Sequence, residues 1–331
     1  MSSPYEAQIE GVLHAVAIHP PTAFSWFGRR IDFLPPRARR AMTEETARSY
    51  LVFNLRHQLY AEFYCRGVAT PTAERPEPQG LGDHMFVEQL AAVNCGRGSW
   101  QSGWRVRAVD GDQIVVQQHG LDIWARREEC LAEEGGLDTG ATVKVRFPNE
   151  LRKMSPGFYM ALGDEDFERS EPVVRLYWHL TADAAVPFVD AATRALNAAR
   201  IPFRLKVVND PIRFTRCDAG VVYVAKPSFE QAARALAPVH AQVAPALRPT
   251  PPALTKRLAP GLSLGEDPPD GDSFGLHRCL LVAEGLVRAA ETGAVTLEDR
   301  LACIADRFAE EGMDVTRPFL NASATDDYEL Q

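Results

Sequence analysis

Apolar and polar side chains alternate along residues 173–181, which is the pattern of a strand buried on one face. Residues 203–208 repeat this alternation, and residues 220–225 form a short apolar run typical of a third strand. Between the first two strands, residues 184–199 place their apolar side chains on one stripe of a helix. The pattern therefore predicts a β-α-β unit, and a further helix is expected to begin at Pro227.

The first half of the chain has a different pattern. Residues 5–18 and 43–66 carry apolar side chains at helical spacing. Residues 99–163 contain short alternating runs instead, and two of these runs flank Asp110 and Gly111, a pair that favours a tight hairpin turn. We therefore expect an α+β fold, in which N-terminal helices with a small antiparallel sheet precede a C-terminal α/β sheet domain with flanking helices.

The segments after the third strand complete this division. Residues 244–273 contain seven prolines, which predicts a long loop, and we expect this loop to close over a substrate. Two helices are expected to follow, at 275–291 and 296–311. The chain is therefore divided into an N-terminal helical and β-rich domain (1–165), a C-terminal sheet domain (166–316) and a disordered tail (317–331).

Composition narrows the class of protein. The 331 residues carry a formal net charge of −8, which argues against a general nucleic-acid binder. The six cysteines are scattered without CxxC spacing, so we expect reduced thiols and no metal site. No apolar run approaches the length of about 20 residues that a membrane span needs, and the N-terminus lacks the pattern of a signal peptide. These features predict a cytoplasmic protein.

Charge adds a specific feature on one face of the predicted sheet. Arg175 and His179 alternate with apolar residues in the first strand, and Arg204 and Lys206 do so in the second. If the helix at 184–199 covers the apolar face, these four side chains gather on the open face. Guanidinium groups match the oxygen atoms of phosphate, so Arg175 and Arg204 are candidate phosphate ligands.

The same group of side chains suits a proton-transfer reaction. Arg216 follows the second strand, and Tyr223 lies in the third. A lysine among arginines is disfavoured as an ammonium ion, so we expect a lowered pKa that allows Lys206 to act as a base. His179 could protonate a leaving oxygen near neutral pH. The cluster therefore predicts elimination of phosphate from phosphoserine or phosphothreonine in a peptide, a reaction that needs no metal or organic cofactor.

Five segments follow one another along the chain: FPNELRKMSPGFYMALGD (147–164), WHLT (178–181), FRLKVVND (203–210), FTRCDAGVVYV (214–224) and SFGLHR (273–278). As an ordered set, the last four resemble the phosphothreonine lyase effectors of pathogenic bacteria. With the first segment included, the chain more closely resembles the HopA-effector family. The resemblance covers residues 140–290. Members of that family act as stand-alone lyases in class V lanthipeptide and thioamitide biosynthesis.

The resemblance implies roles for individual residues and a fold like that of the phosphothreonine lyases. His179 would be the general acid and Lys206 the general base. Arg216 and Arg278 would bind phosphate, and Tyr223 would line the site. The products would be dehydroalanine and dehydrobutyrine.

The resemblance also implies partners. They are a separate Ser/Thr kinase of the same pathway and a phosphorylated precursor peptide with its leader, for which the sheet at 99–163 is a candidate docking surface. Three alternatives stay open: a secreted effector that acts on host phosphoproteins, a non-catalytic phosphopeptide-binding scaffold for the kinase, and a structural face whose arginines pair with carboxylates.

Overall fold

The computed structural model describes residues 3–35, 37–38, 41–71, 82–167, 171–269 and 271–330. Its helices are α1 (Pro4–Ala15), α3 (Glu44–Glu62), α4 (His84–Val93), α5 (Ala182–Ala198), α6 (Phe229–Val243), α7 (Phe274–Thr292) and α8 (Leu297–Glu310). Its strands are β1 (Val16–His19), β2 (Ala23–Trp26), β3 (Arg29–Ile31), β4 (Trp100–Asp110), β5 (Gln113–Gln118), β6 (Leu121–Arg126), β7 (Cys130–Ala132), β8 (Thr142–Arg146), β9 (Glu150–Leu151), β10 (Phe158–Leu162), β11 (Val173–Trp178), β12 (Phe203–Val208), β13 (Gly220–Ala225), β14 (Lys256–Ala259) and β15 (Leu262–Glu266).

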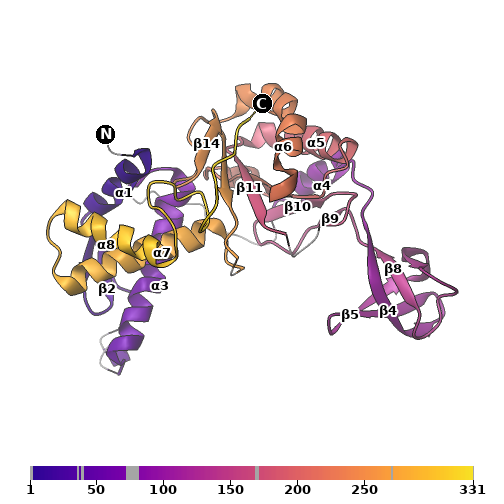
Figure 1. The fold of residues 1–331 in the computed structure, drawn as a ribbon, viewed down its shortest axis with the longest axis horizontal. Coiled ribbons are helices and arrows are strands. Elements are labelled where there is room, and N and C mark those ends of the chain that lie inside the picture. Colours follow the sequence, from indigo (N-terminus) through magenta and orange to yellow (C-terminus); the bar gives the residue numbers. More distant parts are fainter. Residues whose placement is uncertain are drawn as a thin grey trace.

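The molecule has three parts, a helical lobe, a central sheet with helices on it, and a small β-domain (Figure 1). The central sheet has the strand order β14-β15-β11-β13-β12-β10-β9, and each neighbouring pair is antiparallel. Strand β13 lies between β11 and β12, so the predicted β-α-β unit is present with a third strand inserted between its two strands. The α+β fold class is confirmed.

Helices α4, α5 and α6 cover one face of the central sheet. The core on this face includes Leu176 and Trp178 of β11 and Leu205 of β12, as the alternation predicts. Helix α5 contributes Phe188 and Leu196 to the same core. The apolar stripe at 184–199 therefore packs where the sequence places it.

The opposite face is not open, which corrects the prediction. Tyr177 and Val221 belong to a second core that the helical lobe builds with α3 and α7. Gly265 of β15 permits this approach, because a Cβ atom there would lie 2.7 Å from the Phe274 ring. The hydroxyl of Ser273 accepts a hydrogen bond from the backbone N–H of Leu276 and so starts α7 at this point. Helices of the helical lobe therefore cover part of the cationic face.

The small β-domain has the strand order β6-β5-β4-β8-β7 and its own core. The predicted hairpin between β4 and β5 is present, but its turn residues are Gly111 and Asp112, because Asp110 still pairs with Gln113. The division at residue 165 differs from the structure, because β9 and β10 belong to the central sheet and α3 packs on α7. Residues before 165 therefore contribute to all three parts.

Two segments that the sequence left without structure are ordered. Within 244–273, β14 and β15 form a hairpin, and β15 pairs with β11 inside the central sheet, so this hairpin is no part of a lid. The tail after residue 317 packs on the sheet domain, where Phe319 and Tyr328 are buried. The prediction of a disordered tail is therefore corrected, because these apolar side chains fill the core. No helix among the described residues is long and apolar enough to cross a membrane.

The tail packing gives a first testable prediction. The Tyr328 hydroxyl donates a hydrogen bond to Glu266 Oε1 at 2.5 Å in a buried position. Replacing Tyr328 with phenylalanine removes a hydrogen bond to a charged group, which should lower the free energy of unfolding by about 1.5 kcal/mol. Urea denaturation of the Tyr328→Phe variant measures this, with the Tyr50→Phe variant of α3 as the control. Equal stability of the Tyr328→Phe variant and the wild type would contradict an ordered tail.

Candidate active site

Neighbouring strands of the central sheet bring most of the predicted site residues together. Arg175 of β11 lies directly opposite Tyr223 of β13, which in turn lies opposite Arg204 of β12. Cross-strand neighbours share a face, so these three side chains project to the same side. Lys206 follows two residues later on β12, opposite Val221. The two-residue period of the strands thus places these side chains on one face of the sheet, as the sequence predicts.

Lys206 lies between two aromatic rings. Its Nζ atom is 4.5 Å from the centre of the Phe158 ring and 5.8 Å from the centre of the Tyr223 ring. The side chain is half-buried, and Nζ makes no hydrogen bond or ion pair with any residue that the structure describes. Cation–π contacts hold this amine in place without a fixed carboxylate partner.

The Arg216 guanidinium carbon lies 5.1 Å from the centre of the same Phe158 ring, and a carboxylate and a phenol hold this side chain. Its Nε and Nη2 atoms donate to the two oxygens of Asp218 at 2.5 and 2.8 Å, and Nη2 also donates to the Tyr60 hydroxyl at 2.9 Å. Burial acts to raise the pKa of Asp218, but the charges of Arg216 and Lys206 outweigh burial and hold this pKa below its ordinary value. Nη1 of Arg216 has no bond within the described residues.

Arg175 completes the row from the other side of Tyr223. Its guanidinium carbon lies 5.0 Å from the centre of the Tyr223 ring, and its Nη2 atom is 2.5 Å from Asp267. The Nε atom of Arg175 is buried and lacks a hydrogen-bond partner among the described residues. Burial raises the pKa of Asp267 despite the opposing charges of Arg175 and Lys206. Asp267 also lines a cavity of about 730 Å³ at the start of β11.

His179 lies just beyond the end of β11 and is buried. Its Nδ1 atom is 2.6 Å from the carbonyl oxygen of Thr250. Because a carbonyl only accepts, Nδ1 carries the hydrogen, and Nε2 is the nitrogen that can gain a second proton. Burial lowers the pKa of His179, with the Thr250 carbonyl acting against this shift and the charge of Arg248 adding to it. The charge of Asp218 also acts to raise this pKa.

The remaining two predicted phosphate ligands are placed differently. The Arg204 guanidinium lies over the ring of Phe167, 4.7 Å from its centre, beyond Lys206 along β12. Arg278 is fully buried, and its Nε and Nη2 atoms donate to the carbonyl oxygens of Pro318 and Leu320 at 2.7 and 3.1 Å. Arg278 therefore holds the C-terminal tail, which corrects its assignment as a phosphate clamp.

The sequence missed several residues that shape the site. Asp218 and Asp267 are the carboxylate partners of the two central arginines. Asp218 is only two positions from Arg216, so the spacing was a usable signal for this pair. Tyr60 comes from α3, far away in the sequence, and no local pattern points to it. The described residues contain no group of three or more His, Cys, Asp or Glu side chains able to hold a metal ion.

A family model matches this part of the chain. The model of the HopA1 effector protein family matches residues 150–320, which is just over half of the sequence. The chain belongs to the HopA1 effector protein family. The matched residues include β9 to β15 and α5 to α8, so every strand of the central sheet, with His179, Lys206, Arg216 and Tyr223, lies within the family region.

Two solved structures of effector proteins from Pseudomonas syringae are similar to the chain. The protein from pathovar tomato strain DC3000 is 16% identical, with a TM-score of 0.46, and the match covers 82% of this chain and 98% of that one. The protein from pathovar syringae strain 61 is 14% identical, with a TM-score of 0.43, and the match covers 82% and 97%. No curated protein matches the sequence.

Proposed function

We propose that this HopA1-family chain is a lyase that eliminates phosphate from phosphoserine or phosphothreonine in a peptide. The observation that carries the proposal is the position of the Lys206 amine, which is unpaired within the described residues. It lies over the Tyr223 ring that Arg175 also contacts and over the Phe158 ring that Arg216 also contacts. Both arginines are paired with carboxylates, as expected for a structural face. Each nevertheless keeps one nitrogen without a partner among the described residues, Nε in Arg175 and Nη1 in Arg216. These donors suit the oxygens of a phosphate.

The reaction assigns one step to each group. The Lys206 amine takes the proton from Cα of the phosphorylated residue. The electron pair of this C–H bond forms the Cα–Cβ double bond, and the bond between Cβ and the phosphate oxygen breaks. His179 gives its Nε2 proton to the departing oxygen, while Arg175 and Arg216 stabilise the charge on the phosphate. Tyr223 fixes the separation of Arg175 and Lys206, because both contact its ring.

The product distinguishes this proposal from its alternatives. Incubation of the wild-type protein with phosphothreonine and phosphoserine peptides should give dehydrated residues that react with an added thiol, as seen by mass spectrometry. A phosphatase would leave a hydroxyl group, and a scaffold would leave the phosphopeptide intact. Dephosphorylation to threonine, or binding without any reaction in the presence of the kinase and precursor peptide, would overturn the lyase proposal.

The role of His179 predicts a pH dependence. Elimination needs the protonated imidazole, and burial lowers the pKa of His179. The value of kcat/KM should therefore fall as pH rises through a pKa below the ordinary value of about 6.5. A bound phosphate raises this pKa, so kcat should fall only at higher pH. The His179→Gln variant should be slow, and its kcat/KM should no longer fall as pH rises through this pKa. A variant whose kcat/KM still fell in this way would exclude His179 as the acid.

The substrate that we propose is a precursor peptide that a separate Ser/Thr kinase has phosphorylated. The resemblance of the ordered segments to stand-alone lyases of lanthipeptide and thioamitide biosynthesis supports this choice. A secreted effector would apply the same chemistry to folded host phosphoproteins. Rates on a phosphorylated precursor peptide that exceed those on a folded phosphoprotein would favour the peptide substrate.

A further inference from the structure

An arginine that the sequence did not point to lies beside the proposed general acid. Leu180 and Leu247 form an antiparallel bridge, which places Arg248 directly opposite His179. The backbone N–H of Arg248 donates to the carbonyl oxygen of His179 at 3.0 Å, in agreement with this register. Residues that lie opposite each other in an antiparallel pair project their side chains to the same side. Arg248 therefore lies on the side of the sheet that carries His179.

The Arg248 guanidinium reaches the connection that carries Arg216. Its Nη1 atom donates to the carbonyl oxygen of Phe214 at 2.7 Å. Within the described residues the side chain makes no other hydrogen bond and no ion pair, and it is exposed. Its Nε and Nη2 atoms lie on one edge of the guanidinium, the edge that binds two oxygens of a carboxylate or phosphate at once. Arg248 thus presents an unused fork and a positive charge without a carboxylate partner.

The charge balance of the candidate active site calls for such a cation. Arg175 and Arg216 are each paired with a carboxylate, Asp267 and Asp218, so these pairs bring no net charge to a substrate. Lys206 must be neutral when it takes a proton, so its charge does not count either. A phosphate ester on a peptide carries about two negative charges at neutral pH. The phosphate therefore needs positive charge that these groups do not supply.

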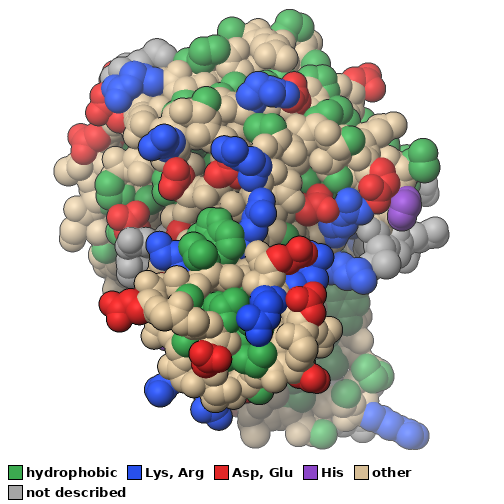
Figure 2. Space-filling model, turned by 90° about the vertical axis from the view of Figure 1, so that its right-hand side faces the viewer, with side chains coloured by type: hydrophobic (Ala, Val, Ile, Leu, Met, Phe, Trp, Pro, Cys, Tyr) green, Lys and Arg blue, Asp and Glu red, His purple; other side chains and the backbone are tan. Residues whose placement is uncertain are grey.

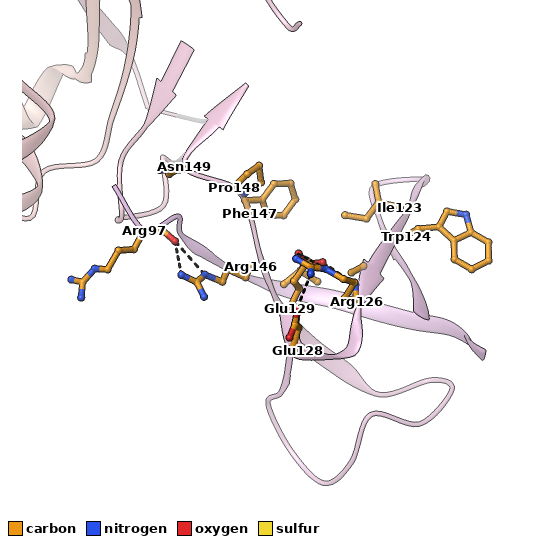
Figure 3. Close-up of a pocket in the computed structure, with 12 residues that line it drawn as sticks. Arg97, Ile123, Trp124, Arg126, Glu128, Glu129, Arg146, Phe147, Pro148 and Asn149 are labelled. Carbon is orange, nitrogen blue, oxygen red and sulfur yellow. Dashed lines mark hydrogen bonds and ion pairs between the residues drawn. The ribbon is translucent and has the colours of Figure 1, made fainter. Parts of the chain in front are cut away.

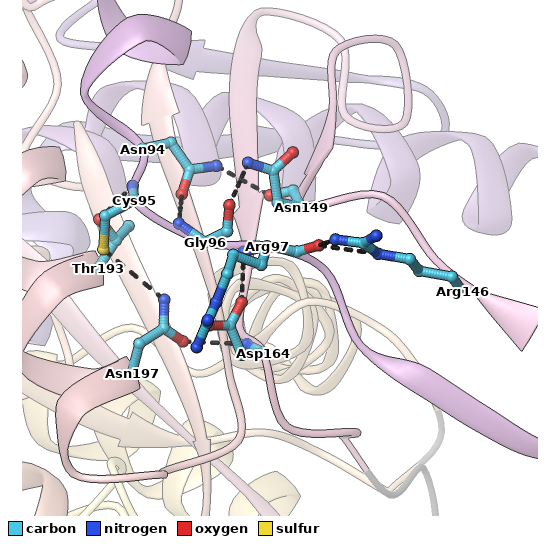
Figure 4. A network of polar contacts seen from close by, with 9 residues as sticks. All are labelled: Asn94, Cys95, Gly96, Arg97, Arg146, Asn149, Asp164, Thr193 and Asn197. Carbon is cyan, nitrogen blue, oxygen red and sulfur yellow. Dashed lines mark hydrogen bonds and ion pairs between the residues drawn. The ribbon is translucent and has the colours of Figure 1, made fainter. Parts of the chain in front are cut away.

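The arginines that gather in the small β-domain are balanced, in contrast to Arg248. Three of them line a pocket of about 610 Å³ between β6 and the end of β8: Arg97, Arg126 and Arg146 (Figure 3). Arg126 pairs with Glu128 and Glu129, and Arg97 pairs with Asp164, as Figure 4 shows. Figure 2 shows cationic and acidic side chains interspersed on the face of the molecule that this domain occupies. This pocket has no net charge with which to hold a phosphate.

From these observations we infer that Arg248 binds the phosphate group of the substrate through Nε and Nη2 and holds it next to His179. The inference rests on the proposed function for the identity of the substrate. It adds a phosphate ligand on the side of the leaving oxygen, where His179 gives its proton. The charge of Arg248 then offsets charge on the phosphate that the two paired arginines leave uncompensated.

Phosphate binding at Arg248 would also prepare the acid. Burial is the largest of the effects that lower the pKa of His179, and the positive charge of Arg248 lowers it further. The Thr250 carbonyl and the charge of Asp218 act in the opposite direction. A bound phosphate neutralises Arg248, so the imidazole is more easily protonated once the substrate is in place.

Substitution of Arg248 in the full-length protein tests the inference. Arg248→Ala should lower kcat/KM for a phosphothreonine peptide at least about tenfold, because charge-assisted hydrogen bonds to the phosphate are lost. Inhibition by inorganic phosphate, the second product, should weaken at least about fivefold in the same variant. Arg248→Lys keeps the charge without the fork, so its kcat/KM should lie between those of the alanine variant and the wild type.

Arg107→Ala is the matched control. Arg107 of β4 is also exposed and has no ion pair within the described residues, but it lies in the small β-domain. Its replacement changes the net charge of the protein equally and should leave kcat/KM and phosphate inhibition as in the wild type. Equal effects of the Arg248→Ala and Arg107→Ala variants would overturn the inference, since net charge alone would then explain the loss.

A binding measurement separates this outcome from that of the lyase proposal. Fluorescence anisotropy compares Lys206→Ala with the double variant Lys206→Ala/Arg248→Ala, using a fluorescein-labelled phosphothreonine peptide and its unphosphorylated form. The second substitution should weaken binding of the phosphopeptide at least about fivefold and leave binding of the unphosphorylated peptide unchanged. If this holds but the wild type removes no phosphate, the lyase proposal fails and the role of Arg248 stands. If the wild type and the Arg248→Ala variant eliminate phosphate equally well, the lyase proposal stands and this inference fails.

Discussion

Replacing Lys206 with alanine is expected to lower the rate of phosphate elimination by about 10²–10⁴-fold, the usual contribution of a positioned general base. Lys206 Nζ is held over the rings of Phe158 and Tyr223. No other lysine lies in β11, β12 or β13, the strands that carry the site. Phosphopeptide binding should persist, because the partnerless nitrogens of Arg175 and Arg216 are unchanged. Mass spectrometry of the product and a separate binding titration measure the two effects.

Two control variants sharpen this experiment. Lys153→Ala removes an exposed lysine from the loop before β10 and should leave the rate unchanged. Lys206→Arg keeps the charge but offers no base near neutral pH, so it should be as inactive as the alanine variant. Full activity of the arginine variant would show that Lys206 acts through its charge and that another group removes the proton.

The strands of the site were predictable because a two-residue period also fixes the face of each side chain. Arg175, Lys206 and Tyr223 lie together for this reason. The insertion of β13 between β11 and β12 did not follow from the pattern, since the period contains no information about strand order. The helical cover over Tyr177 comes from residues far away in the sequence, such as Tyr64 of the turn after α3.

The segments that escaped prediction depend on tertiary contacts. Strand β15 consists of Leu262–Glu266 among prolines, and its strand form depends on pairing with β11 on one side and β14 on the other. The tail depends on Arg278, whose side chain supplies donors to tail carbonyls. The motif that contains Arg278 predicts a phosphate ligand, because sequence does not reveal which acceptor a buried guanidinium meets.

The Asp218–Arg216 pair leads to the second large prediction. Asp218→Asn keeps the volume of the side chain but leaves the charge of Arg216 without a counterion in a mostly buried position. Breaking such a pair should lower the free energy of unfolding by about 3 kcal/mol or more. Asp190→Asn is the matched control, because its pair with Arg194 is exposed to solvent and should contribute little to the free energy of unfolding. Urea denaturation at neutral pH measures both variants.

The pH dependence of the stability difference between the wild type and the Asp218→Asn variant identifies the cause of that difference. The pKa of Asp218 in the folded protein is below its ordinary value, so its stabilising effect is present above the ordinary pKa and is lost as pH falls through the folded-state pKa. The wild type and the Asp218→Asn variant should therefore converge in stability in strong acid. Adding Arg216→Met to Asp218→Asn should restore much of the lost stability at neutral pH, since the unpaired charge is then removed. A double variant as unstable as Asp218→Asn would mean that Asp218 stabilises the fold through other contacts.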